Sequence, residues 1–186
     1  MFFFLNYLST LFIYFSYLTK GGAAALQYGM NKKYNATVEY NIFYDMGASS
    51  TEATLVAFST GKDAKKKVVT KFEVKGVGYD RQLGGNDFDY RLAKHIGEQF
   101  KKTHKGPSNI FHNDRSWTKL MKEATRVKQI LSANAETYAR VESILDDKDL
   151  NIRVTRADFE ELVPDLFARV TKPITDAVAQ AGITLV

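Results

Sequence analysis

Short apolar runs alternate with longer stretches of helical periodicity along most of the chain. Five of the apolar runs end at clusters of Gly, Ser, Asp or Lys, a pattern that predicts β-strands joined by turns. The predicted strands are residues 38–44, 53–58, 68–77, 137–144 and 151–154. Residues 59–67 are polar and predict a hairpin loop, and the acidic residues 146–149 predict a turn between the last two strands.

Between and after these strands, the spacing of apolar residues predicts helices. The predicted helices are the alanine-rich residues 23–33, then 86–102 and 114–131, and a final stretch from Phe159 to Val178. In residues 86–102, Phe88, Leu92, Ile96 and Phe100 recur every four positions and share one helix face. The mixture of strands and helices predicts an α/β fold.

The last helical stretch has recognisable boundaries and breaks. Thr155 and Asp158 have the spacing of a capping box, which predicts a helix start after Thr155. An apolar stripe follows from Phe159 to Val178, and Pro164 and Pro173 are expected to kink or divide it because proline removes a backbone donor. Gly182 is suited to the C-terminal end of the stretch.

The first twenty residues differ from the rest of the chain. They hold eight aromatic residues, no acid and a single base, Lys20. Three interpretations compete: a membrane span of about minimal length, a signal peptide followed by the small residues 23–25, or an extension foreign to the domain.

Composition narrows the function classes. The chain has 186 residues with 25% charged and 45% hydrophobic residues, which is the composition of a globular domain. The absence of cysteine excludes disulfide scaffolds, thiolate zinc sites and cysteine nucleophiles, and the three histidines are too scattered to predict a metal site. The net charge of +5 does not by itself indicate nucleic-acid binding.

One lysine-rich stretch needs a separate interpretation. Lys62, Lys65, Lys66 and Lys67, with Lys71, are interpreted as a solvated hairpin tip. A surface for single-stranded nucleic acid needs aromatic platforms beside its cations, and none is adjacent to the first four lysines. No nucleic-acid partner is therefore expected.

The first candidate for chemistry is the stretch from Asn41 to Thr51, where an apolar strand ends at Asp45. The small residues that follow let backbone N–H groups approach phosphate oxygens, and the carboxylate of Asp45 could position a hydrated Mg²⁺ or an attacking water. These small residues are Gly47, Ala48, Ser49 and Ser50. A plain hairpin turn is the competing interpretation.

Two further patterns are weaker when taken alone. Gly84 and Gly85 precede a predicted helix, where paired glycines can admit a ligand close to the backbone, or simply form a loop before a capped helix. Lys128 and Ser132 lie one turn apart on the next helix, which also suits an ordinary solvated face.

Taken together, residues 21–186 resemble the seventy-kilodalton heat-shock protein family. The motifs that carry the resemblance are Ala23-Ala24-Ala25-Leu26-Gln27-Tyr28-Gly29, Tyr44-Asp45-Met46-Gly47, Leu83-Gly84-Gly85-Asn86-Asp87-Phe88-Asp89, Lys128-Gln129-Ile130-Leu131-Ser132 and Val154-Thr155-Arg156-Ala157-Asp158-Phe159-Glu160-Glu161-Leu162. The resemblance implies part of the second lobe of an actin-like, ribonuclease-H-like ATPase domain. It also implies ATP or ADP with Mg²⁺ as cofactors, contacted by both glycine-containing loops and by the helix around Lys128.

The branch of the family can be narrowed. Gly76-Val77-Gly78-Tyr79-Asp80 and Leu131-Ser132-Ala133-Asn134-Ala135-Glu136 are similar to the large endoplasmic-reticulum branch. Asn35-Ala36-Thr37 is a glycosylation acceptor, which fits a location in the endoplasmic-reticulum lumen. The resemblance then implies unfolded polypeptides as clients and a lumenal chaperone of the same family as a partner in nucleotide exchange.

The chain departs from the family pattern at several site positions. Thr125 stands where the family has a Glu, and Gln129 stands where it has an Arg that stacks on adenine, so altered adenosine contacts are expected. Ala48 and Ser49 replace glycines, which is expected to tighten or distort the phosphate loop. The family's first phosphate loop and catalytic lysine have no counterpart in this sequence, so residues 21–186 alone are expected not to hydrolyse ATP.

This placement bears on the first twenty residues. If Ala23 to Gly29 form an interior helix, residues 1–20 are best interpreted as a foreign or mis-spliced extension, with a hydrophobic anchor as the alternative. A membrane contact is expected only in the second case. Two other functions remain open at this point: an actin-like phosphotransferase such as a sugar kinase, and a membrane-anchored interaction protein.

Overall fold

The computed structural model describes residues 19–30, 32–35, 37–62, 64–104, 106 and 108–184. The hydrophobic segment 1–20 lies outside these residues, apart from Thr19 and Lys20. Among the described residues, no helix has both the length and the apolar character needed to cross a membrane. The described residues form two compact units: those up to Met46, 50–81 and 171–184 in the first, and those in 47–49 and 82–170 in the second.

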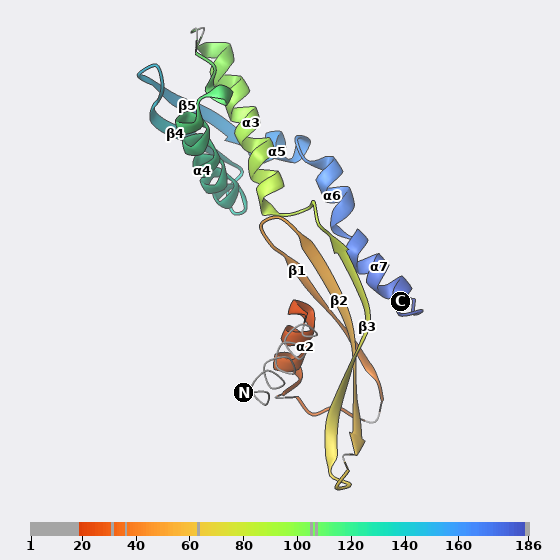
Figure 1. The fold of residues 1–186 in the computed structure, drawn as a ribbon. Helices are drawn as coiled ribbons and strands as arrows, with labels where there is room; N and C mark the ends of the chain where they lie inside the picture. The colour runs from red at the N-terminus through yellow and green to blue at the C-terminus, as the bar shows by residue number, and fades with distance from the viewer. Residues whose placement is uncertain are drawn as a thin grey trace, which may run out of the picture. The chain divides into compact units, whose positions relative to one another are not determined.

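The first unit is built on a three-stranded antiparallel sheet with β2 in the centre (Figure 1). Its strands are β1 (Glu39–Met46), β2 (Thr51–Lys62) and β3 (Val68–Asp80). Residues 53–58 of β2 are all buried, which is the pattern of a strand covered on both faces.

A helix covers each face of this sheet (Figure 1). The helix α2 (Lys20–Met30) contributes Ala25 to a cluster with Val56 and Phe58. The helix α7 (Lys172–Gln180) contributes Ala177 to a cluster with Ala53 and Leu55. Because alternate residues of a strand point to opposite faces, the two clusters lie on opposite sides of β2.

Helix α7 lies unusually close to β3. A Cβ atom at Gly76 would come within 2.0 Å of the carbonyl oxygen of Ala177, and one at Gly78 within 2.0 Å of that of Pro173. The backbone N–H of Val77 donates to the side chain of Gln180 at 2.7 Å. Glycine is therefore required at both positions of β3 for the helix to sit at this distance.

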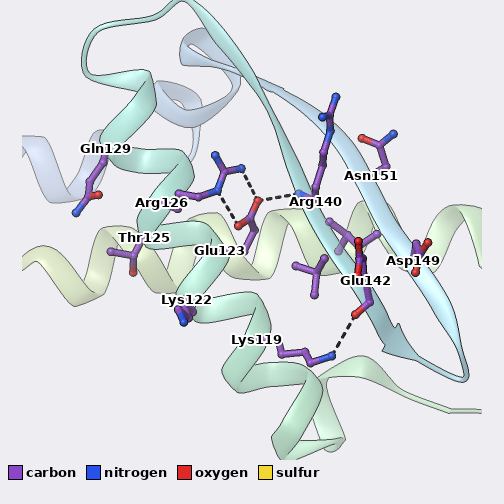
Figure 2. A pocket seen from close by; sticks show the side chains of 12 residues that line it. Lys119, Lys122, Glu123, Thr125, Arg126, Gln129, Arg140, Glu142, Asp149 and Asn151 are labelled. Carbon is purple, nitrogen blue, oxygen red and sulfur yellow. Dashed lines mark hydrogen bonds and ion pairs between the residues drawn. The ribbon is translucent and has the colours of Figure 1, made fainter.

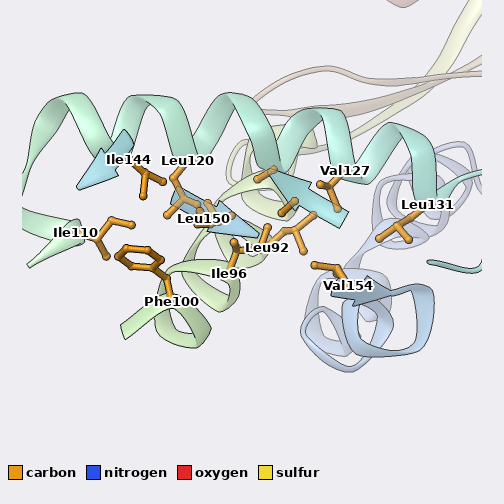
Figure 3. Close-up of a cluster of buried hydrophobic side chains, with 13 residues drawn as sticks. Leu92, Ile96, Phe100, Ile110, Leu120, Val127, Leu131, Ile144, Leu150 and Val154 are labelled. Atoms are coloured by element: carbon orange, nitrogen blue, oxygen red, sulfur yellow. The ribbon is translucent and has the colours of Figure 1, made fainter. Parts of the chain in front are cut away.

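The second unit packs two long helices against a β-hairpin (Figure 3). Its main elements are α3 (Gly85–Thr103), the short η1 (Ile110–His112), α4 (Asp114–Leu131), β4 (Glu136–Leu145) and β5 (Lys148–Thr155). The apolar faces predicted for α3 and α4 are confirmed, since Leu92, Ile96, Leu120 and Val127 are all fully buried in one cluster with residues of both strands.

The chain turns sharply between β4 and β5. Asp146 and Asp147 both have positive φ, at 50° and 58°, as a two-residue hairpin turn requires. A turn is confirmed here, but it is shorter than the predicted 146–149, because β5 already begins at Lys148.

The capping box before the next helix is also confirmed. The Thr155 hydroxyl accepts from the N–H of Asp158 at 3.1 Å, and the Asp158 carboxylate accepts from the N–H of Thr155 at 2.9 Å. It opens α5 (Arg156–Glu161), which is followed by α6 (Pro164–Val170) and then by α7.

Several sequence predictions need correction. Strands β2 and β3 are longer than expected: β2 extends to Lys62, so residues 59–62 belong to the strand and not to the predicted hairpin loop of 59–67. The first helix begins at Lys20 and ends at Met30, because the Thr19 hydroxyl accepts from the N–H of Gly22 at 3.1 Å and caps it earlier than predicted.

The last apolar stripe is not continuous. The two prolines divide it as predicted, and α6 begins at Pro164 while α7 has Pro173 in its first turn. As a result Phe159 packs in the core of the second unit and Ile174 in that of the first. Gly182 follows α7 with φ at 66°, which confirms its role at the C-terminal end.

A candidate nucleotide-binding site

The phosphate-loop candidate and the paired glycines come together in the second unit. The loop leaves β1 after Met46 and enters β2 at Thr51, and its carbonyl oxygens meet the start of α3. Gly85 N–H donates to the Gly47 carbonyl at 2.9 Å, and Asn86 N–H donates to the Ala48 carbonyl at 2.8 Å. Two motifs that the sequence presented separately are therefore joined by backbone hydrogen bonds.

The approach of these two backbones depends on Gly84. A Cβ atom there would lie 2.4 Å from the Ala48 carbonyl oxygen and 2.5 Å from the Ser49 nitrogen. At Gly85 the nearest atom would be the Lys128 ammonium nitrogen, at 3.5 Å. The missing side chain at Gly84 thus allows the backbone of the 47–50 loop to approach α3. The first N–H groups of α3 already donate hydrogen bonds to this loop. Ala48 and Ser49, which replace family glycines, remain exposed at the surface of the loop.

Lys128 connects α4 to this arrangement. Its ammonium donates to the Gly85 carbonyl at 3.1 Å and lies 2.8 Å from the carboxylate oxygen Oδ1 of Asp89 on α3. The side chain of Lys128 is 26% exposed and that of Asp89 only 8%. The alternative that Lys128 lies on an ordinary solvated face is therefore wrong.

The hydroxyl groups on α4 are bonded within their own helix. Ser132 donates to the Gln129 carbonyl at 2.6 Å, and Thr125 donates to the Met121 carbonyl at 3.1 Å. The amide of Gln129 is exposed. A ligand at this helix could donate hydrogen bonds to the two hydroxyl oxygens or bind the Gln129 amide. To bind Lys128, it would have to compete with Gly85 and Asp89 for the hydrogen bonds that the ammonium donates.

Two of the α4 residues face a different feature of the second unit. A hollow of about 910 Å³ lies between α4 and the β4–β5 hairpin, and Thr125 and Gln129 are among the residues that line it (Figure 2). Lys128 and Ser132 are not among them. The four residues predicted to contact adenosine therefore fall into two pairs: Thr125 and Gln129 line the hollow, whereas Lys128 and Ser132 do not.

The wall of this hollow is held by a nearly buried carboxylate, Glu123 (Figure 2). It accepts from the Arg126 guanidinium at 2.5 and 2.8 Å and from the backbone N–H of Arg140 at 2.7 Å. The hydrogen bonds from Arg126 to Glu123 raise the pKa of the guanidinium above its ordinary value. Through its bond from the Arg140 N–H, the Glu123 carboxylate joins α4 to β4.

Asp45 and Ser50 belong to the first unit. Asp45 lies opposite Glu52 in the β1–β2 register, and its side chain is 57% exposed at 4.0 Å from the Lys20 ammonium. Lys20, Asp45 and Glu52 share a small hollow of about 190 Å³. Ser50 is exposed at the end of the loop.

In the part of the chain that the structure describes, no group of three or more His, Cys, Asp or Glu side chains could hold a metal ion. Asp45 remains the one predicted position for a hydrated Mg²⁺. The other predicted modification site, Asn35, is exposed between α2 and β1, and its carbonyl accepts from the Thr60 hydroxyl at 3.3 Å.

Sequence reasoning missed two carboxylates that organise the site. Asp89 ends one of the family motifs, but the sequence predicts no contact for it, although it is the ion-pair partner of Lys128. Glu123 carried no prediction. Both could have been predicted to form ion pairs, because each is an acid on an otherwise apolar helix face, where a buried charge needs a partner.

The family model described as Hsp70 protein matches residues 18–185. The chain belongs to the Hsp70 family. Its fold is therefore a part of the actin-like Hsp70 ATPase domain, which agrees with the mixed α/β architecture and the small antiparallel sheets observed.

Individual Hsp70 relatives support the narrower branch. The chain is 41% identical over 165 residues to hypoxia up-regulated protein 1 of Danio rerio, 42% over 165 residues to that of Xenopus laevis and 39% over 167 residues to that of Homo sapiens. Each comparison covers 88% of this chain, but only 17% of the Danio and human proteins and 26% of the Xenopus protein. The chain thus spans about a quarter or less of the length of these relatives.

Proposed function

We propose that this chain is a portion of the ATPase domain of an Hsp70-family chaperone, and that it contributes the second phosphate loop and one adenosine-facing helix to an ATP- or ADP-binding site. The observation that carries the proposal is the convergence of three separate motifs. Gly47 and Ala48 of the loop, Gly85 at the start of α3 and Lys128 of α4 are linked by backbone and side-chain hydrogen bonds.

The residues present fit the phosphate part of a nucleotide better than its base. The exposed, small side chains at Ala48, Ser49 and Ser50 leave room for phosphate oxygens beside the loop backbone. Asp45 would orient a hydrated Mg²⁺, which would neutralise phosphate charge when bound. On α4, the Lys128 ammonium already donates hydrogen bonds to Asp89 and Gly85. A hydrogen bond from Lys128 to a ribose hydroxyl would therefore have to share the ammonium with these two partners.

Domain organisation and location follow from the same proposal. Residues 21–186 would be part of the second lobe, and residues 1–20 an extension outside it, either foreign or a membrane anchor. The names of the relatives support a place among the hypoxia up-regulated chaperones. The protein would then act in the endoplasmic-reticulum lumen, hold unfolded polypeptides and assist nucleotide exchange on a lumenal Hsp70. The family match favours this function over the phosphotransferase alternative.

A chimera provides the decisive test. Residues 18–185 of this chain would replace the matching segment of the Danio rerio relative, and ADP binding would be measured by calorimetric titration. We expect binding by the chimera and no ATP hydrolysis by residues 21–186 alone. Absence of ADP binding by a folded chimera would contradict the proposal. Turnover by the isolated residues that is abolished by Asp45→Ala would show that lobe I is not required.

A further inference from the structure

A second hollow, of about 560 Å³, lies on the sheet of the first unit, away from the residues assigned to nucleotide. Val38 and Tyr40 line it and are 46% and 49% exposed, which is high for large apolar side chains. The strand register explains the hollow: Tyr40 lies opposite Ala57 of β2, and Ala57 lies opposite Glu73 of β3. The small central residue leaves space between two larger neighbours.

Lysines border this hollow on the β3 side. Lys71 and Lys75 are among its lining residues, and the one acid among them, Glu73, is already paired with Lys75 at 2.7 Å. The stem of Lys71 crosses Gly61 on β2, where a Cβ atom would lie only 2.2 Å from its Cε. The absence of a side chain at Gly61 leaves room for the Lys71 side chain to lie across β2.

The positive charge continues to the end of the β2–β3 hairpin. Lys62, Lys65, Lys66 and Lys67 are all exposed. Together with Lys71 they place five lysines between residues 62 and 71, where the sequence has a single acid, Asp63. The sequence prediction found no aromatic side chain beside the first four lysines, whereas the structure places Tyr40 in the same hollow as Lys71.

We propose that this surface, defined by Val38, Tyr40, Lys62, Lys66 and Lys71, docks an acidic polypeptide segment that also carries apolar side chains. The lysines would attract its carboxylates, and the hollow would receive one or two apolar side chains. Exposed sheet surface of this kind suits an extended peptide, whose alternate side chains face the same way. The proposal is independent of nucleotide binding and uses none of the residues assigned to it.

Two other classes of partner fit less well. A lipid bilayer is best met by apolar side chains that project beyond the cations, whereas here they line a hollow. Nucleic-acid phosphates are commonly held by the bidentate guanidinium of arginine, and residues 62–75 contain none.

Fluorescence anisotropy with the full chain can test the proposal. The probes are three labelled short peptides of equal length that alternate Glu with Leu, Glu with Ser, and Lys with Leu. We expect the Glu–Leu peptide to bind most tightly, the Glu–Ser peptide about tenfold more weakly, and the Lys–Leu peptide not to bind. Added salt should weaken the Glu–Leu complex because exposed charges are screened.

Matched variants locate the binding. Lys62→Glu, Lys66→Glu and Lys71→Glu combined should weaken Glu–Leu binding about tenfold or more. Lys94→Glu, Lys122→Glu and Lys148→Glu combined make the same charge change in the second unit and should leave it unchanged. Tyr40→Ala should weaken the Glu–Leu complex but not the Glu–Ser complex.

Three results would overturn the proposal: no binding of either acidic peptide, equal loss in both lysine variants, or a Tyr40→Ala variant that binds like the parent. Binding to vesicles of phosphatidylcholine and phosphatidylserine in place of peptide, lost in the first lysine variant, would assign the surface to lipid instead. Circular dichroism of each variant confirms that the fold is retained.

Discussion

The ammonium of Lys128 lies 2.8 Å from the carboxylate of Asp89, so a largely buried ion pair joins α4 to α3. The same ammonium donates to the Gly85 carbonyl. Removing the cation would leave Asp89, only 8% exposed, without its partner. Breaking a buried pair costs about 3–5 kcal/mol, and we expect about 2–3 kcal/mol for Lys128→Ala because Lys128 is partly solvated. Urea denaturation would measure this loss.

Substitutions at Lys128 and at its partner can show whether Lys128 binds the nucleotide or only stabilises the fold. In the chimera, Lys128→Ala should weaken ADP binding about tenfold or more, since a charged hydrogen bond is worth about 1.5–3 kcal/mol. Asp89→Asn breaks the ion pair but keeps the cation, and Lys66→Ala on the hairpin tip is the control. If Asp89→Asn weakens ADP binding as much as Lys128→Ala does, Lys128 acts through the fold. If Lys128→Ala and Lys66→Ala both bind like the parent, Lys128 is not part of the site.

Gly84 and Gly85 offer a matched pair of substitutions. Gly84→Ala would place a methyl group 2.4 Å from the Ala48 carbonyl oxygen, so the phosphate loop must move. We expect about 1–3 kcal/mol of destabilisation, as for other overpacked sites, and weaker ADP binding by the chimera. Gly85→Ala meets nothing closer than 3.5 Å and should change the free energy of unfolding by less than about 0.5 kcal/mol. Equal effects of the two substitutions would contradict the close approach described.

Close packing of α7 on β3 gives a second matched pair. In Gly78→Ala the new methyl group would meet backbone, the Pro173 carbonyl oxygen at 2.0 Å, and we expect a loss of about 2–3 kcal/mol or more. In Gly61→Ala it would meet only the flexible end of Lys71, which can move aside. Thermal unfolding of the two variants should therefore differ by several degrees. A Gly78→Ala variant as stable as Gly61→Ala would show that α7 is not held at this distance.

The capping box at Thr155 predicts how stability depends on pH. Hydrogen bonds from the side chain and backbone of Thr155 lower the pKa of the Asp158 carboxyl. Its contribution to stability is therefore complete above the unfolded pKa of about 3.9 and is lost as the pH falls through the lower, folded value. Asp158→Asn should flatten the curve of unfolding free energy below about pH 5, and Thr155→Ala should flatten it in part. Parallel curves for the parent and Asp158→Asn would rule out this contribution.

Asn35 provides a test of compartment. Its side chain belongs to an exposed segment between α2 and β1, where an oligosaccharide transferase could reach it. We expect a glycosidase-sensitive mass shift when the chain is secreted behind a functional signal peptide. Asn35→Gln and Thr37→Ala should both abolish the shift, whereas Thr37→Ser should retain it. An unmodified lumenal product would mean that the acceptor is not used.

Local features of the fold could be predicted from the sequence, because neighbouring residues alone determine them. The capping box of Thr155 and Asp158 and the breaks at Pro164 and Pro173 are of this kind. The helix start at Lys20 was missed because Thr19 was grouped with the hydrophobic run and its capping role was overlooked.

Features that join distant segments were harder to predict. The spacing of Lys128 and Ser132 on α4 suggested a shared face, but only packing shows that Lys128 turns to Asp89 while Ser132 bonds within its own helix. The length of the β2–β3 hairpin was underestimated because Gly61 and its polar neighbours resemble a turn, although pairing with β3 keeps them extended.

The return of α7 to β3 has a consequence for the order of folding. Gln82 and Arg169, near the two ends of the second unit, are joined by a hydrogen bond of 3.0 Å from the guanidinium to the carbonyl. The second unit is nearly continuous in sequence, so it can form from contacts between nearby residues. The sheet of the first unit, in contrast, is covered on one face by α7, which is synthesised only after residues 82–170. Closing so long a loop is entropically costly until its ends are brought together. During synthesis, folding of the inserted second unit would thus bring the two ends of the loop together, so that α7 can pack on Gly76 and Gly78 of β3.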